Sequence, residues 1–144
     1  MLNENLLVCM EQKAILLTHI LDITKEIQVR CKQEELVFDN LFEDRQAYID
    51  RVAKCNKLIE NILEACEPKE KAHLEQILEA DANAKATGSE ENRLLQYSIT
   101  ANKHLHKILS IHKATLCKLH QEHEELQELL GKEQKNSAVL ENFK

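Results

Sequence analysis

The sequence contains few of the residues on which β structure and tight turns depend. Its 144 residues include two glycines, one proline and no tryptophan, and aromatic residues make up only 3% of the chain. Sheets favour aromatic and β-branched residues with frequent turns. Leu, Ile, Ala, Glu, Lys and Gln dominate instead, and most of these are strong helix formers. We therefore expect a single all-α domain.

Long apolar runs and an excess of basic charge are also missing. No stretch approaches the roughly 20 apolar residues that span a bilayer. The first 25 residues lack the basic start and unbroken apolar core of a signal peptide. A formal net charge of −6, with cations interleaved among acids, argues against a nucleic-acid partner. These absences predict a cytoplasmic protein with neither membrane nor nucleic acid as a partner.

The five cysteines form no Cys-x-x-Cys motif and are spread along predicted helices. In a reducing compartment such residues behave as small buried apolar side chains. We expect them to be free thiols that serve packing: Cys9, Cys31, Cys55, Cys66 and Cys117.

Apolar residues recur at steps of three and four, which places them on one face of a helix because each residue turns the chain by about 100°. The pattern predicts an antiparallel bundle of about four helices over residues 1–131, with long, coiled-coil-like first, second and fourth helices. A flexible C-terminal tail is expected at 132–144. The predicted helices span about 3–30, 34–67, 68–85 and 89–130.

The first helix carries two overlapping apolar stripes, so it should contact at least two other helices.

Local sequence signals mark the boundaries of the third and fourth helices. Pro68 predicts a sharp corner and the start of the third helix. The third helix has a thin stripe and should be the least firmly held. We expect Gly88 to close it with a positive φ, and Ser89 to cap the fourth helix.

The helix predicted over 34–67 contains one conspicuous polar residue. Arg45 stands where its apolar stripe calls for another apolar side chain. Two interpretations are open at this point. The arginine is either a snorkelling side chain that reaches water along the helix surface, or a fixed polar contact inside the bundle.

Catalytic and metal-binding patterns are weak. Cys117, His120 and His123 are spaced i, i+3, i+6, which is awkward for one ion. A single Glu-x-x-His pair, Glu70 and His73, falls short of the two that a di-iron bundle needs. No Gly-rich phosphate loop and no Gly-x-Ser-x-Gly turn is present. We expect no enzyme activity, no metal site and no cofactor.

Three segments resemble those of a known family. Leu17-Thr18-His19-Ile20 is similar to a Leu-Thr-x-x-Ile-like stretch in its first helix. Residues 41–49 resemble a Leu-x-x-x-Arg-x-x-Leu-Ile-like segment, with Arg45 at the arginine. Residues 74–81 resemble an Ile-x-x-Ile-Leu-x-x-Asp-like third helix. The family is that of the flagellar type III export chaperones, above all the FliT-type chaperone of the filament-cap protein, with the FlgN-type chaperone of the hook–filament junction proteins as second choice.

The resemblance implies a cytosolic, non-enzymatic chaperone. Such a protein holds the C-terminal helical segment of an export client, such as the filament-cap or hook-junction protein, and passes it to the export apparatus. The implied groove lies on the second and third helices, and Leu94–Leu130 would cover it. The implied partner-binding residues are Leu41, Arg45, Tyr48, Ile49, Val52 and Ile77.

Two other functions fit the same pattern. The long heptad of the fourth helix also suits a structural coiled-coil or dimerisation module, which would form a homodimer and bind no client. A metal-binding helical bundle is the less favoured alternative.

Overall fold

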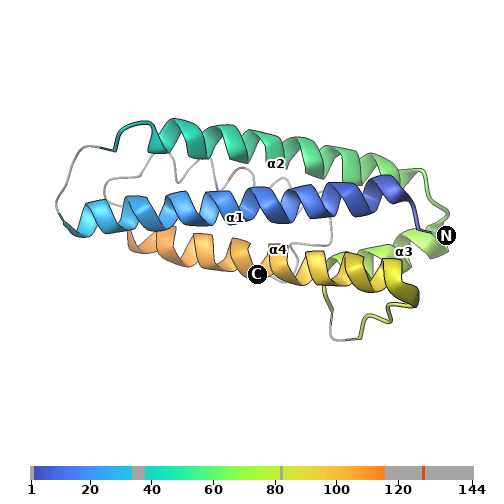
Figure 1. Ribbon diagram of the computed structural model, residues 1–144. Helices are drawn as coiled ribbons and strands as arrows, with labels where there is room; N and C mark the ends of the chain where they lie inside the picture. Colours follow the sequence, from blue (N-terminus) through green and yellow to red (C-terminus); the bar gives the residue numbers. More distant parts are fainter. Residues whose placement is uncertain (1, 34–37, 82, 116–127, 129–144) are drawn as a thin grey trace.

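The computed structural model describes residues 2–33, 38–81, 83–115 and 128. They form an all-α bundle (Figure 1), and this part of the chain contains no strand. The fold class expected from the scarcity of glycine, proline and aromatic residues is thereby confirmed. Its helices are α1 (Glu4–Lys32), α2 (Leu41–Glu64), α3 (Pro68–Leu78) and α4 (Gly88–Ala114).

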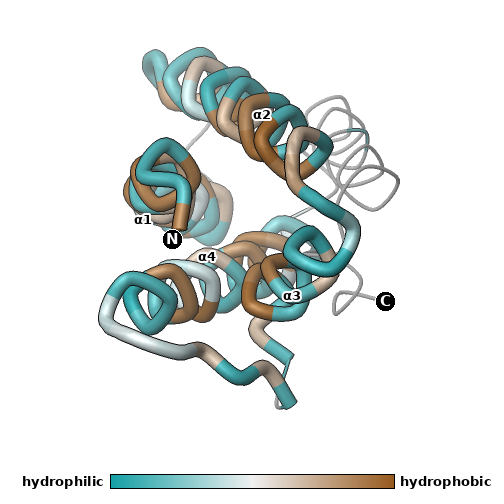
Figure 2. The backbone as a smooth tube through the Cα atoms, turned by 90° about the vertical axis from the view of Figure 1, so that its right-hand side faces the viewer, coloured by the Kyte–Doolittle hydropathy of each residue, from teal (hydrophilic) through white to brown (hydrophobic). Residues whose placement is uncertain are grey.

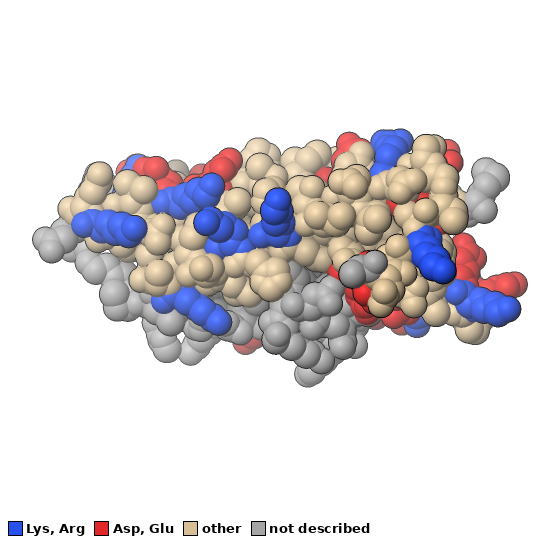
Figure 3. Space-filling view, turned by 90° about the horizontal axis from the view of Figure 1, so that it is seen from below, with Lys and Arg blue, Asp and Glu red and all other residues tan. Residues whose placement is uncertain are grey.

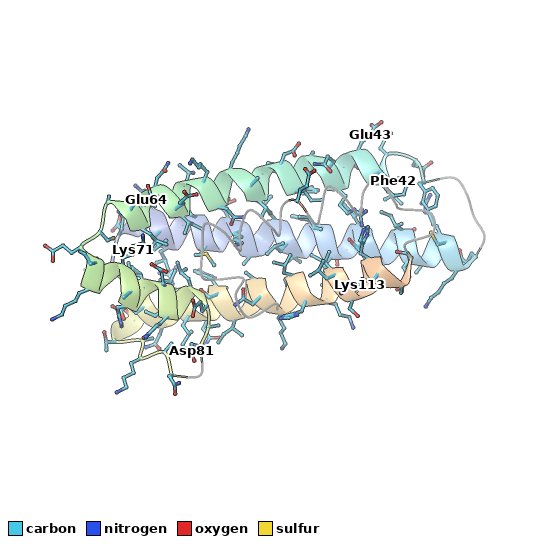
Figure 4. The ribbon with its side chains drawn as sticks, turned by 180° about the vertical axis from the view of Figure 1, so that it is seen from behind. Phe42, Glu43, Glu64, Lys71, Asp81 and Lys113 are labelled. Carbon is cyan, nitrogen blue, oxygen red and sulfur yellow. The ribbon has the colours of Figure 1, made fainter. Side chains whose placement is uncertain are left out.

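The central helix of the bundle is α1, which packs along α2 on one side and α4 on the other (Figure 2). The α1–α2 pair is antiparallel as expected. The second helix brings the chain back to the end at which α1 begins, and α3 lies at that end, so that α4 starts there and runs parallel to α1 (Figure 1). Figure 4 agrees, because Phe42 and Lys113 lie toward one end of the bundle and Glu64 and Lys71 toward the other.

Burial on α1 follows from this central position. Its two apolar stripes both contribute to the core, which confirms the prediction of more than one neighbouring helix. Burying each Leu or Ile side chain contributes about 1.5–3 kcal/mol to folding. The buried apolar residues of α1 are Leu6, Leu7, Cys9, Met10, Ala14, Leu16, Leu17, Ile20, Leu21 and Ile27.

The second helix is shorter than the sequence predicted. It begins at Leu41, not at residue 34, after a turn in which Asp39 has a φ of +49°. Aspartate tolerates this left-handed conformation better than most residues. Arg30 Nη1 also lies 3.1 Å from Asp39 Oδ2, which ties the turn to the end of α1. At its other end α2 stops at Glu64, and Pro68 starts α3 as predicted.

The third helix ends at Leu78, not at residue 85. Ala80 has a φ of +54° and takes the left-handed position that usually follows a helix. Its N–H donates to the Ile77 carbonyl at 3.0 Å, and the Asp81 N–H donates to the Gln76 carbonyl at 3.3 Å. This pair of bonds is a Schellman motif, formed here around alanine where glycine is usual.

The fourth helix starts at Gly88, whose φ is +81°, with Thr87 as its N-cap. The predicted positive φ of Gly88 is confirmed, but Gly88 begins α4 and does not close α3, and the N-cap is Thr87 and not Ser89. Glu91 Oε1 accepts hydrogen bonds from the Thr87 N–H at 3.1 Å and the Thr87 hydroxyl at 3.3 Å. The same oxygen lies 2.8 Å from His73 Nε2, which fastens α3 to the first turn of α4.

The end of α4 also differs from its prediction. The helix stops at Ala114, so the unbroken helix expected to residue 130 is interrupted. The Thr115 hydroxyl donates to the carbonyls of Ile111 and His112, at 3.3 and 3.1 Å, which satisfies acceptors that the helix end leaves open. Apart from residue 128, the rest of that predicted helix and the predicted tail at 132–144 lie outside the described residues.

Candidate functional site

The six predicted partner-binding residues do not share one environment. Leu41 and Tyr48 are half-buried. The other four lie inside the bundle, each with no more than 3% of its surface exposed: Arg45, Ile49, Val52 and Ile77. Most of the predicted set therefore belongs to the hydrophobic core and its internal contacts.

The predicted cover of that groove, Leu94–Leu130, is described as far as Thr115. This part packs along α1 and against α3, and not along α2. Its position follows from the parallel arrangement of α1 and α4. The remainder of the predicted cover, residue 128 apart, lies outside the described residues.

Arg45 makes a fixed polar contact. Its side chain is fully buried, and its Nη1 donates to Thr24 Oγ1 at 3.1 Å. The Thr24 hydroxyl donates in turn to the Ile20 carbonyl at 2.7 Å, and the Phe42 ring centroid lies 5.9 Å from the Arg45 guanidinium carbon. A buried guanidinium requires such partners because leaving water is costly for a charge. The snorkelling interpretation is wrong, and Arg45 joins α2 to α1.

Tyr48 marks the outer side of the contact between α1 and α2. Its ring stacks on exposed His19 with centroids 5.0 Å apart and planes 15° from parallel. The Arg51 guanidinium carbon also lies over the Tyr48 ring, 5.8 Å from its centroid. The outer line along which α1 and α2 meet therefore carries aromatic as well as apolar surface.

A groove opens between the start of α1 and the end of α2, with a volume of about 500 Å³. None of its lining residues is charged, although charged residues make up 31% of the chain. An uncharged, largely apolar hollow on such a surface is typical of an interaction site. This α1–α2 groove is lined by Asn3, Asn5, Val8, Cys9, Leu58, Asn61, Ile62 and Ala65.

The two most exposed large apolar side chains of the described residues belong to this groove. Val8 and Leu58 have 56% and 53% of their surface exposed, one on each helix. Cys9 is buried beside them, and burial raises the pKa of its thiol. A neutral thiol packs as a small apolar group and is a weak nucleophile. The groove is therefore suited to binding an apolar surface, and not to covalent chemistry.

Sequence reasoning missed this groove although a signal was present. Val8 belongs to neither apolar stripe of α1, and Leu58 lies between members of the α2 stripe, next to Ile59. A large apolar side chain outside the buried face of its helix is exposed to water unless another surface covers it. The coincidence of two such residues on helices that pack together becomes visible only in the folded chain.

Metal-ligating residues do not gather elsewhere in the described ranges. No three His, Cys, Asp or Glu side chains within them are placed to hold one ion. The Cys117, His120 and His123 series lies outside the described residues. The four cysteines within them are free thiols, and no helix of this part of the chain is long and apolar enough to cross a bilayer.

Comparison with protein-family models, with curated proteins and with solved structures finds no match. The segments that resemble the flagellar export chaperones lie on three helices: residues 17–20 on α1, 41–49 at the start of α2, and 74–81 across the end of α3. What the protein does is therefore argued from its own residues.

Proposed function

We propose that this protein binds an amphipathic helical segment of another protein in the α1–α2 groove. The biological role that fits is a cytoplasmic, non-enzymatic export chaperone, which holds the C-terminal segment of a client as the flagellar export chaperones do. The observation that carries the proposal is the uncharged apolar groove between exposed Val8 and Leu58. An amphipathic helix that lays its apolar face into such a groove is a common mode of recognition.

A helical ligand suits this groove for two reasons. Its walls are two antiparallel helices, and the ridges of a third helix pack into the furrow between two others. Its rim carries Asn3, Asn5 and Asn61, whose amides can hydrogen-bond to the polar flank of a ligand. No charged group has to leave water when the groove is filled, so apolar burial is not offset by desolvation of a charge.

The six residues implied by the resemblance form a second candidate surface. Arg45, Ile49, Val52 and Ile77 are buried, so a client reaches them only if the bundle opens. The α1–α2 groove needs no such opening. We therefore assign first contact with the client to the groove.

The test is calorimetric titration of the full chain with the C-terminal segments of a filament-cap protein and a hook-junction protein from the same organism. We expect saturable one-to-one binding of one segment. Val8→Asp and Leu58→Asp should each weaken it by about tenfold or more, because a carboxylate would be buried against the apolar ligand. Val29→Asp is the matched control, since Val29 is an exposed valine of the same helix that does not line the groove.

Three outcomes contradict the proposal in different ways. Failure of both segments to bind removes the export-chaperone role. Binding that Val8→Asp and Val29→Asp weaken equally removes the groove as its site. Light scattering that shows a stable dimer, dissociated by Val8→Asp and not by Val29→Asp, assigns the groove to a second copy of this chain and favours the dimerisation module.

A further inference from the structure

The second half of α4 is a cationic surface on an anionic chain. Between residues 92 and 115 the sequence has one arginine, three lysines and no Asp or Glu, whereas the whole chain has a net charge of −6. The acidic residues of α4, Glu90 and Glu91, lie in its first turn. Charge is thus segregated along the helix, and its outer face after that turn is basic.

A lysine of α1 extends this surface across to the neighbouring helix. Burial lowers the pKa of His104, and Lys25 and Lys103 lower it further, while Asp22 opposes them. Asp22 and Lys25 of α1 are thus near enough to His104 of α4 to act on its charge. All four lysines of the surface are exposed. The four lysines, Lys25, Lys103, Lys107 and Lys113, are called the basic stripe; Lys103 and Lys107 lie along one side of α4, and Lys113 is turned about 120° from Lys107 around the helix.

Figure 3 shows this face: several Lys and Arg side chains lie over the half in which α4 ends, with carboxylates along one edge of that half, and the opposite end carries side chains of both signs. Lys103 and Lys107 are one turn apart, so they are neighbours on the helix surface. Lys113 lies roughly 15 Å further along α4 than Lys103, at about 1.5 Å per residue, and on a different side of the helix. None of its four lysines forms an ion pair with another described residue.

We propose that the basic stripe docks an acidic helical segment of a partner protein. Like charges held one turn apart, as at Lys103 and Lys107, repel one another, and carboxylates that approach them relieve this repulsion. A single exposed ion pair contributes little, so recognition needs several pairs in register. Glutamates one turn apart on a partner helix match Lys103 and Lys107. Such complementarity steers association and sets orientation more than it adds affinity.

An acidic protein segment fits the stripe better than a nucleic acid does. The stripe offers only four lysines, and Asp22 is about one helical turn from Lys25 on α1. Beyond it, the net charge of −6 repels a polyphosphate, whose binding depends on neutralising many phosphates together. The stripe is also separate from the α1–α2 groove, so this inference stands whether or not the groove binds a client.

The probe is a fluorescently labelled helical peptide with glutamates one turn apart, compared by anisotropy with the same peptide carrying glutamines. We expect the full chain to bind the glutamate peptide at low ionic strength, and salt to weaken binding. The double variant Lys103→Glu/Lys107→Glu should weaken it roughly tenfold or more. The control is Lys54→Glu/Lys57→Glu, which changes the net charge equally at two exposed lysines of α2.

Circular dichroism establishes that both double variants remain helical. Equal weakening by the two doubles would reduce the effect to net charge and overturn the assignment to the stripe. Absence of binding to the glutamate peptide at low salt overturns it as well. Tighter binding of a single-stranded oligonucleotide of the same charge would replace the acidic segment by a nucleic acid.

Discussion

Arg45 of α2 donates a hydrogen bond from Nη1 to the Thr24 hydroxyl of α1 over 3.1 Å, and both side chains are buried. The same hydroxyl donates to the Ile20 carbonyl one turn earlier. One oxygen therefore holds a buried cation while remaining bonded to its own helix. The contact sets how α1 and α2 align along their shared length.

This contact predicts a large effect of Thr24→Val, which keeps the shape of the side chain and removes its oxygen. Arg45 Nη1 loses a buried acceptor, so the free energy of unfolding should fall by about 1–3 kcal/mol. Urea denaturation measures it. Thr18→Val is the control, because the Thr18 hydroxyl bonds similarly to the Ala14 carbonyl but lies on the exposed face. Similar losses in both variants would show that the Arg45 contact contributes nothing.

The left-handed alanine after α3 predicts a stabilising glycine. An L-residue in this conformation costs about 1–2 kcal/mol, part of which is offset by the greater freedom of glycine when unfolded. Ala80→Gly should therefore raise the free energy of unfolding by about 0.5–1 kcal/mol. Ala72→Gly, at an exposed position inside the same helix, should lower it by about 1 kcal/mol. Thermal and urea denaturation would contradict the motif if both changes had the same sign.

The contact between α1 and α4 predicts that the hydroxyl of Tyr97 contributes to the free energy of unfolding and that the hydroxyl of Tyr48 does not. Tyr97 Oη donates to Glu11 Oε2 at 2.8 Å, a charge-assisted bond in a half-buried setting. Tyr97→Phe should lower the free energy of unfolding by about 1 kcal/mol or somewhat more. Tyr48→Phe should be nearly neutral, because Tyr48 stacks on His19 through its ring and its hydroxyl has no partner among the described residues. Equal losses would argue against the Glu11 bond.

Glu91 predicts a specific dependence of stability on pH. Burial raises the pKa of its carboxyl, but the hydrogen bonds with His73 and Thr87 outweigh this, so its pKa lies below the ordinary 4.5. A lowered pKa in the folded state means that the contribution to stability is complete above the unfolded pKa and is lost as pH falls through the folded one.

The measurement is the free energy of unfolding of the native chain and of Glu91→Gln from pH 7 to acid. Their difference should persist down to about pH 4.5 and shrink below it. Glu90→Gln controls for the helix dipole, because Glu90 occupies the same first turn of α4. A difference between the native chain and Glu91→Gln that is independent of pH in acid would contradict the role of the carboxylate.

Features with a local physical cause were predictable. Pro68 starts α3 because proline fixes its own φ and favours an extended residue before it. The two stripes of α1 predicted two neighbouring helices, because each apolar stripe must pack against a helix of its own to leave water. The left-handed residues Asp39, in the turn before α2, and Ala80, after α3, were not predictable in this way. Neither is glycine, the residue that usually takes this conformation, and surrounding contacts hold them there.

The candidate site shows the same division. Periodicity placed Arg45 in a seam but left open whether it reaches water, and the Thr24 hydroxyl decided the answer. The α1–α2 groove needs Val8 and Leu58 together, and they are 50 positions apart in the chain. Neither residue alone predicts an interaction surface, since single exposed apolar side chains are common.

By itself the sequence determined that the chain is helical and which face of each helix is apolar, because both follow from residues within a few turns of one another. The tertiary structure alone decided that α4 runs parallel to α1, that Arg45 is buried, and that Val8 and Leu58 meet in an open groove. Helical periodicity gives a direction around one axis and says nothing about which neighbour lies there. Packing between distant segments supplies that choice, and with it the surfaces on which a partner can bind.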